Sequence, residues 1–198
     1  MNLNLNSQKN IKKFYKKLWL YKSIIFFKTK FTYNGEVDLQ TKYIVEALNI
    51  KKRKERITFV FDKTCEVIDK KYEGINICGF CNRVCERFSN MKKNYLDGCC
   101  RYCLYITPNG CPSKNVGCKL FNCTTVKEKY DVYEYKDLPI LKILSLKNRI
   151  IIRQDLFSLR EDVLKDLYSY SFIYSSLRML FRISRNFYKK NKLRKQKK

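Results

Sequence analysis

Nine of the ten cysteines in this sequence lie between Cys78 and Cys123, and the sequence contains no histidine. Two pairs, Cys78 with Cys81 and Cys100 with Cys103, form the pattern C-x2-C-x18-C-x2-C. A tight turn across each pair can direct two thiolates at one ion, so two turns supply four tetrahedral sulfur ligands at a spacing typical of zinc-ribbon sites. The pattern therefore predicts a metal site, with Cys99 as an alternative to Cys100.

The cysteines outside these two pairs leave room for a second site. They are Cys85, Cys99, Cys111, Cys118 and Cys123. The looser spacing is also compatible with a single site and additional thiols. Because histidine is absent, mixed cysteine–histidine zinc sites are excluded, and so is a histidine base for a catalytic cysteine. All-sulfur ligation suits zinc or, alternatively, an iron–sulfur cluster held by Cys85 with the later cysteines. No catalytic constellation stands out.

Three stretches of the window also carry a family resemblance. They are Cys99-Cys100-Arg101-Tyr102-Cys103, Asn109-Gly110-Cys111 and Cys118-Lys119-Leu120-Phe121-Asn122-Cys123. Together with the early C-x2-C spacing they resemble the zinc- or iron-chelating cysteine-cluster family, over about a quarter of the chain. The resemblance implies metal ligation by Cys78, Cys81, the 99/100 pair, Cys111, Cys118 and Cys123. It implies no particular reaction.

The chain is strongly basic, with 43 Lys and Arg against 18 Asp and Glu, a net charge of +25. Such a charge is typical of proteins that bind nucleic acid or an anionic membrane surface. An AT-rich genome is an alternative source, because the chain has one alanine and many Lys, Asn and Ile residues. We therefore expect the apolar faces of the basic terminal helices to pack into one core with their lysines solvated. The alternative is that these helices bind a polyanionic partner, either nucleic acid or an anionic membrane surface.

The compartment follows from the N-terminal sequence and the cysteines. Lysines interleave with apolar residues in the first 27 residues, unlike a signal peptide, and no stretch of about 18 apolar residues suggests a membrane span. We expect a cytoplasmic protein, where clustered cysteines serve as ligands more often than as disulfides. A secreted disulfide-bonded protein is a weaker alternative.

Hydrophobic periodicity predicts helices on both sides of the cysteine window. The expected helices are residues 8–29, 36–48 and 55–73, one opened by Asp137-Leu138-Pro139 that runs through Leu146, one opened by a capping box at Ser158 and Glu161, and a final one that carries Ile173 to Lys189. Cys65 lies on the apolar face of the third helix and is expected to be a buried core thiol. In the last helix Ile173, Leu177, Leu180 and Phe187 are expected on the buried side, and Arg178, Arg182, Arg185 and Lys189 on another.

The fold class predicted from these features is mainly α, with helical N- and C-terminal segments packed around a loop-rich cysteine metal-binding module. Gly and Pro concentrate between residues 76 and 125, which sets the module boundaries. The expected regions are a basic helical region over 1–75, the cysteine module over 76–125, and a helical region with a basic tail over 126–198.

Overall fold

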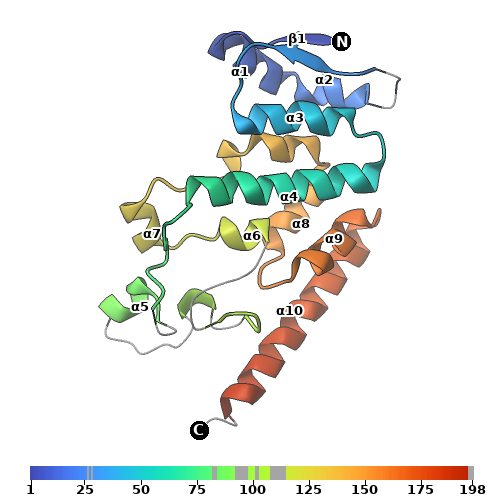
Figure 1. The fold of residues 1–198 in the computed structure, drawn as a ribbon. Coiled ribbons are helices and arrows are strands. Elements are labelled where there is room, and N and C mark those ends of the chain that lie inside the picture. Colours follow the sequence, from blue (N-terminus) through green and yellow to red (C-terminus); the bar gives the residue numbers. More distant parts are fainter. Residues whose placement is uncertain are drawn as a thin grey trace. The chain divides into compact units, whose positions relative to one another are not determined.

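The computed structural model of the protein describes residues 1–25, 27, 29–81, 84–91, 98–100, 103–107 and 115–195, and all their side chains except those of residues 90, 99, 194 and 195. This part of the chain is mainly helical, which confirms the prediction of a mainly α fold (Figure 1). Its α-helices are α1 (Gln8–Lys16), α2 (Leu18–Ser23), α3 (Leu39–Asn49), α4 (Arg53–Lys71), α5 (Glu86–Asn90), α6 (Val116–Lys119), α7 (Thr124–Lys129), α8 (Leu146–Gln154), α9 (Arg160–Tyr168) and α10 (Phe172–Lys195). Its other elements are the 3-10 helices η1 (Gly98–Cys100), η2 (Tyr135–Asp137) and η3 (Pro139–Ile143) and the strands β1 (Asn2–Asn4) and β2 (Thr32–Asn34).

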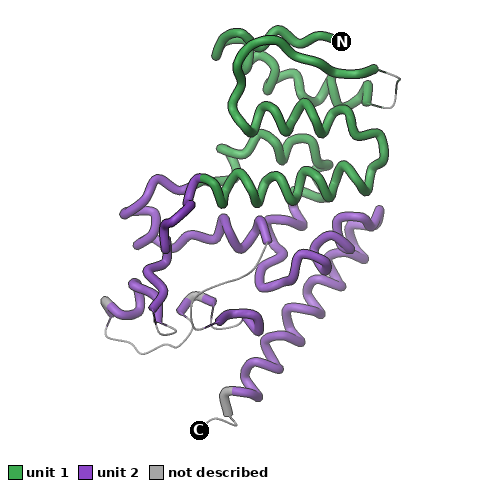
Figure 2. The backbone as a smooth tube through the Cα atoms, viewed as in Figure 1, with its two compact units in different colours: residues 1–70, 133–149 green, residues 71–132, 150–198 purple. Residues whose placement is uncertain are grey.

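The chain folds as two compact units, each built from two separate stretches of sequence (Figure 2). Unit 1 comprises residues 1–70 and 133–149, and unit 2 comprises residues 71–132 and 150–198. The predicted cysteine module, residues 76–125, therefore lies in unit 2, in the same compact unit as the chain from residue 150 onward.

Unit 1 has an apolar core formed mainly by helices. Both α2 and α3 contact η3, and the two short strands pair in parallel with Leu3 opposite Tyr33. Its most deeply buried side chains include Leu5, Leu18, Ile25, Phe31, Ile44, Leu48, Phe61, Ile140 and Leu141. The Gln40 side chain reinforces the contact with η3, because it donates to the Asp137 carbonyl and accepts from the Ile140 N–H.

The N-terminal helix is interrupted at Lys17, so the prediction of one helix over residues 8–29 was wrong in length. Lys17 adopts φ −92° and ψ 4°, and its N–H donates to the carbonyls of both Lys13 and Phe14. The chain resumes as α2 one residue later. Apolar periodicity continues across this break, since Phe14 and Leu18 are both buried, and it therefore gives no signal of the interruption.

The helices α3 and α4 agree with the sequence prediction. Asp38 caps α3 by accepting a 2.7 Å hydrogen bond from the Thr41 N–H. In α4 the thiol of Cys65 is buried at 5% exposure, which confirms its assignment to the core. Gly74 follows α4 with φ 74°, the left-handed conformation that favours glycine after a helix.

In unit 2 the capping-box prediction at Ser158 was wrong. The helix α9 begins at Arg160 with Leu159 as its N-cap, and no side chain caps it. The Ser158 hydroxyl instead donates to the Asp155 carboxylate and accepts from Arg182 of α10. A serine that satisfies a buried ion pair is not available to cap the helix next to it.

The stretch 139–146 also differs from the prediction of one helix. Its first part is the 3-10 helix η3, and Leu146 instead starts α8, a separate α-helix. Ile151 and Ile152 lie inside α8 and are completely buried.

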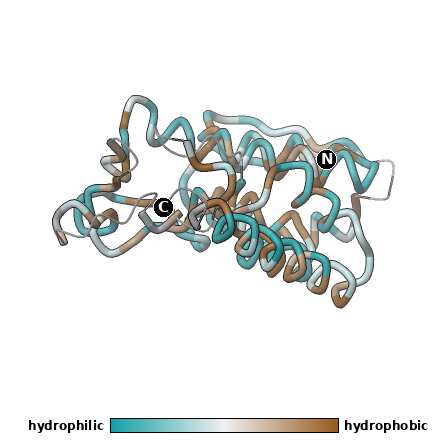
Figure 3. Tube along the Cα trace, turned by 90° about the horizontal axis from the view of Figure 1, so that it is seen from below, coloured by the Kyte–Doolittle hydropathy of each residue, from teal (hydrophilic) through white to brown (hydrophobic). Residues whose placement is uncertain are grey.

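The long helix α10 buries its polar side and exposes its apolar side, the reverse of the prediction. The residues buried along α10 are Ser175, Met179, Arg182, Asn186 and Lys190, which recur at helical spacing. Ile173, Leu177 and Leu180, predicted to be buried, are 72%, 63% and 55% exposed. Figure 3 shows hydrophobic and hydrophilic segments alternating along successive turns of α10.

Candidate metal centre

The first C-x2-C turn, from Cys78 to Cys81, is held by the side chain of Asn76. Its Oδ1 accepts from the Phe80 N–H and its Nδ2 donates to the Phe80 carbonyl, both over 3.0 Å. Gly79 lies inside the turn with φ 52° and donates its N–H to the Asn76 carbonyl. The turn therefore has a defined shape, with Cys78 and Cys81 both exposed at its ends.

A second reversal brings Cys85 back beside the first turn. Cys81 and Val84 exchange two backbone hydrogen bonds of 2.9 Å, and the Glu86 N–H donates to the Cys78 carbonyl. The thiol of Cys85 is buried, at 7% exposure, immediately before α5. The three early cysteines thus belong to one hydrogen-bonded loop.

The 3-10 helix η1, which leads into the second C-x2-C turn, lies against Cys85. A Cβ atom built on Gly98 would lie 2.6 Å from the Cys85 sulfur and 3.3 Å from its Cβ, and Gly98 has φ 50°. Only glycine is compatible with both this conformation and this approach. The close contact places the start of the Cys100–Cys103 segment beside the loop that carries Cys78, Cys81 and Cys85.

A backbone hydrogen bond joins the two cysteines of the second C-x2-C segment. The Cys103 N–H donates to the Cys100 carbonyl over 2.7 Å, and the Tyr105 N–H donates to the Cys103 sulfur over 3.4 Å. Cys103 is buried at 2% exposure, while Cys100 is half-buried. An N–H donated to sulfur stabilises negative charge on a thiolate, as metal ligation requires.

The late cysteines Cys118 and Cys123 belong to unit 2 but lie outside the loop that carries Cys78, Cys81 and Cys85. Cys118 belongs to α6, and its sulfur accepts a 3.2 Å hydrogen bond from the N–H of Phe157. Phe157 adopts φ 61°, a left-handed conformation that is uncommon for a bulky residue. Cys123 is the N-cap residue of α7, and its side chain makes no capping hydrogen bond.

An ion pair connects the segments that carry the early and late cysteines. Lys129 of α7 lies 3.1 Å from both carboxylate oxygens of Glu86, the residue that follows Cys85. The pair is exposed, so its energetic contribution is small. It is a direct side-chain contact between α5 and α7 within unit 2.

The predicted ligands are therefore brought together in part. Cys78, Cys81 and Cys85 share one hydrogen-bonded loop, and Gly98, two residues before Cys100, lies against Cys85. Cys118 lies in α6, and Cys123 is the N-cap residue of α7. Within the residues that the structure describes, no three Cys, Asp or Glu side chains converge closely enough to hold a metal ion. Cys111 and the side chain of Cys99 lie outside the described residues.

The chemistry of the donor set fits zinc or an iron–sulfur cluster. The predicted ligands are thiolates without exception, which are soft ligands suited to both. Backbone N–H groups already point at two of the sulfurs, those of Cys103 and Cys118. Such donors commonly surround metal-bound thiolates.

Sequence reasoning missed a buried ion cluster in unit 2. Arg182 donates from Nη2 to Asp155 over 2.6 Å and to Asp166 over 2.9 Å, and both carboxylates are fully buried. Arg178 forms a further ion pair with Asp166. In the sequence, Ser175, Arg182 and Asn186 recur at helical spacing and thus share one face of a helix. This spacing does not predict burial of that face unless the positions of Asp155 and Asp166 are known.

The ion cluster extends to the residues just before Cys118. The buried Asn115 side chain donates to the carbonyls of Asp155 and Ser158, and its Oδ1 accepts from the Gly117 N–H. A Cβ on Gly117 would lie 2.4 Å from the Ile152 carbonyl oxygen. The turn before Cys118 therefore fits closely against the segment from the end of α8 to Ser158.

Comparison of the sequence with known protein families, with curated proteins and with solved structures found no match. Among the described residues, every helix is too short or too polar to cross a bilayer.

Proposed function

We propose that the chain is a cytoplasmic metal-binding protein with a structural all-cysteine zinc site. Cys78, Cys81, Cys100 and Cys103 would hold the ion, which would fix a loop-rich segment that has little apolar core of its own. The observation that supports the proposal is that a Cβ atom built on Gly98, two residues before Cys100, would lie 2.6 Å from the Cys85 sulfur, four residues after Cys81. Structural zinc contributes about 10–16 kcal/mol of apparent folding free energy in small modules.

A second site, holding an iron–sulfur cluster, is the alternative function. Its ligands would be Cys85, Cys111, Cys118 and Cys123. The Phe157 N–H that points at the Cys118 sulfur favours it, because hydrogen bonds to sulfur tune cluster potentials. Electron transfer or modification chemistry would then follow. In either case we propose membership of the zinc- or iron-chelating cysteine-cluster family.

The metal module would support interaction with a polyanion, and we do not assign it a catalytic role. The net charge of +25 gives the chain a strong positive field at physiological pH. Nucleic acid and an anionic membrane surface are the two partners that such a field favours, through the basic terminal helices.

Metal analysis and a visible spectrum of protein purified without oxygen test the site. Bound zinc without colour supports the structural site. Bound iron with a broad band near about 400 nm supports the cluster instead. A metal-free chain with intact disulfides would contradict both.

Matched cysteine variants locate the ligands. We expect Cys103→Ser to lower the metal content and to destabilise unit 2, because it removes one of four ligands. Cys65→Ser is the control, since this thiol lies in the core of α4 and outside the cluster. An equal metal content in the two variants would exclude Cys103 as a ligand.

A further inference from the structure

The exposed face of α10 has the composition of a helix that lies on an anionic lipid bilayer. Its large exposed side chains include Ile173, Tyr174, Leu177, Leu180, Phe181 and Tyr188. These residues recur at helical spacing and share one broad side of α10. Large apolar residues gathered in this way mark an interaction surface more often than a solvated one.

The orientation of α10 is fixed by its opposite, polar face. Arg182 lies between the buried carboxylates of Asp155 and Asp166, and Ser175 donates to the Asp166 carbonyl. Rotating the helix to bury Leu177 and Phe181 would remove Arg182 from its two carboxylates. These buried polar contacts would be lost if the helix turned about its axis, so they keep the apolar face of α10 exposed.

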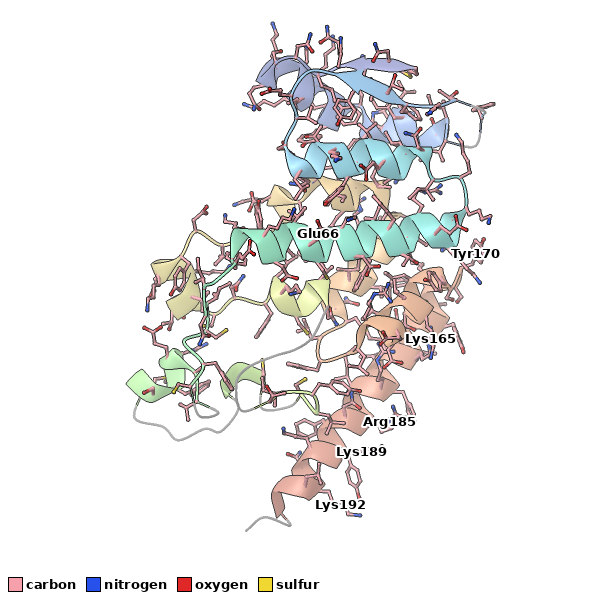
Figure 4. All side chains as sticks on the ribbon, viewed as in Figure 1. Glu66, Lys165, Tyr170, Arg185, Lys189 and Lys192 are labelled. Atoms are coloured by element: carbon pink, nitrogen blue, oxygen red, sulfur yellow. The ribbon has the colours of Figure 1, made fainter. Side chains whose placement is uncertain are left out.

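Cations flank the apolar face toward the C-terminal end. Arg185, Lys189 and Lys192 are exposed and project from the C-terminal half of α10 (Figure 4). The helix contains no acidic residue. An apolar face with Tyr and Phe, bordered by Lys and Arg, matches a helix that buries its apolar side at the acyl boundary and places its cations among anionic headgroups.

This charge pattern distinguishes the bilayer from other occupants. A second copy of the chain, docked on this face, would cover the aliphatic residues but would offer the cations no anionic partner from α10, which contains no acidic residue. Nucleic acid would engage the cations and stack on the aromatic rings, but it would leave Ile173, Leu177 and Leu180 in water. A bilayer accommodates the aliphatic residues and the cations together.

We propose that α10 docks the protein onto an anionic lipid bilayer through this face. The inference rests on the proposed polyanionic partner and identifies it as an anionic lipid bilayer. Docking of α10 does not require a bound metal ion. It assigns docking to α10 alone among the basic helices.

Co-sedimentation with phosphatidylglycerol–phosphatidylcholine vesicles tests the proposal, with phosphatidylcholine vesicles as the neutral comparison. We expect binding to the anionic vesicles that weakens with salt. Arg185→Glu combined with Lys192→Glu should lower the vesicle affinity roughly tenfold or more. Lys12→Glu combined with Lys16→Glu in α1 is the matched control, because it changes the net charge equally at exposed positions and should retain most of the binding.

The apolar contribution needs its own pair of variants. Phe181→Glu should abolish vesicle binding, whereas Trp19→Glu, at the 72% exposed Trp19 of α2, should not. Circular dichroism verifies that each variant is folded. Equal losses in the α10 and N-terminal variants would overturn the assignment to α10.

The remaining outcomes separate this inference from the proposed partner. Binding of an oligonucleotide without binding of vesicles would overturn the bilayer and leave the polyanionic partner standing. Binding of neither would overturn both. Self-association that Phe181→Glu abolishes, without vesicle binding, would assign the face to a second copy.

Discussion

The guanidinium of Arg182 lies 2.6 Å from the Asp155 carboxylate, and the two side chains are only 7% and 0% exposed. Arg182 bonds in the same way to Asp166, so two buried anions from different segments of unit 2 share one cation. The basic residues near Arg182 in the sequence suggest a solvated arginine. Its side chain is instead central to the packing of unit 2.

Arg182→Ala should destabilise the protein by about 3–5 kcal/mol, because it leaves two buried carboxylates without their shared cation. Urea unfolding measures the loss. Arg185→Ala, at an exposed position of the same helix, should change the free energy of unfolding by less than about 0.5 kcal/mol. Similar losses in the two variants would contradict a special role for Arg182.

The same variant should show a pH signature. Burial raises the pKa of Asp155, against the lowering effects of Ser158 and Arg182, and removing Arg182 should raise it further. A carboxyl with a raised folded-state pKa destabilises the native state above that pKa, and the penalty disappears as the pH falls through it. The deficit of Arg182→Ala should therefore be smaller at pH 4 than at pH 7, and a deficit that is independent of pH would contradict this electrostatic cause.

Glu66 in unit 1 should contribute stability with the opposite sign. Hydrogen bonds from Lys63 and then from Tyr43 lower its pKa to about 2. The contribution is thus present above the unfolded value near 4.5 and is lost as the pH falls toward 2. Because the side chain is 35% exposed, solvent screening limits the contribution to about 1 kcal/mol or less.

Glu66→Gln measures this contribution by thermal unfolding at several pH values. It should lower stability at pH 7 and have little effect near pH 2. Glu73→Gln, at an exposed position just beyond α4, is the control and should have little effect at either pH. A Glu66→Gln deficit that persists unchanged at pH 2 would indicate lost packing rather than lost charge.

Gly98 and Gly74 form a matched pair for testing the cysteine site. Both have positive φ, but a Cβ at Gly74 meets nothing within 4 Å, whereas a Cβ at Gly98 meets the Cys85 sulfur. Gly74→Ala should cost about 1–2 kcal/mol from backbone strain alone. Gly98→Ala should cost more and should also weaken metal binding roughly 10–100-fold, measured by competition with a chelator. Unchanged metal affinity in Gly98→Ala would separate this glycine from the site.

Asn115→Ala should destabilise the protein by about 1–3 kcal/mol, because buried partners of its amide lose their hydrogen bonds. Asn122→Ala provides the contrast. The side-chain nitrogen of Asn122 is buried without a hydrogen-bond partner among the described residues, so its removal should be close to neutral. Chemical unfolding of the two variants makes the comparison, and equal losses would show that side-chain volume rather than hydrogen bonding decides.

Periodicity predicted α3 and α4 because their apolar residues face a core that is apolar as well. In α4 the predicted stripe includes Val60, Phe61 and Ile68, which are all at most 1% exposed. The prediction of a tight turn between Cys78 and Cys81 is also confirmed, because a turn depends mainly on the residues within it.

The burial of α10 could not be predicted in this way. Its polar face is buried because Asp155 and Asp166 lie opposite it. No local sequence pattern predicts the pairing of Arg182 with these two carboxylates. Ser158 was misinterpreted for the same reason, since a tertiary partner replaced its local role. A metal site that combined early and late cysteines would depend on similar long-range contacts, so spacing alone leaves the ligand pairing open.

The close fit of Asn115 and Gly117 against the chain between Ile152 and Ser158 has a practical consequence for dissecting the protein. A recombinant fragment cut at residues 76 and 125 would contain nine cysteines but lack the carbonyl groups that hold the turn before Cys118. The two carbonyl-lined contacts would then be open to water. In such a fragment the turn before Cys118 would lack the contacts that hold it in the folded protein. Metal binding by the isolated fragment would therefore measure the general affinity of its thiols for metal and not the affinity of the folded protein.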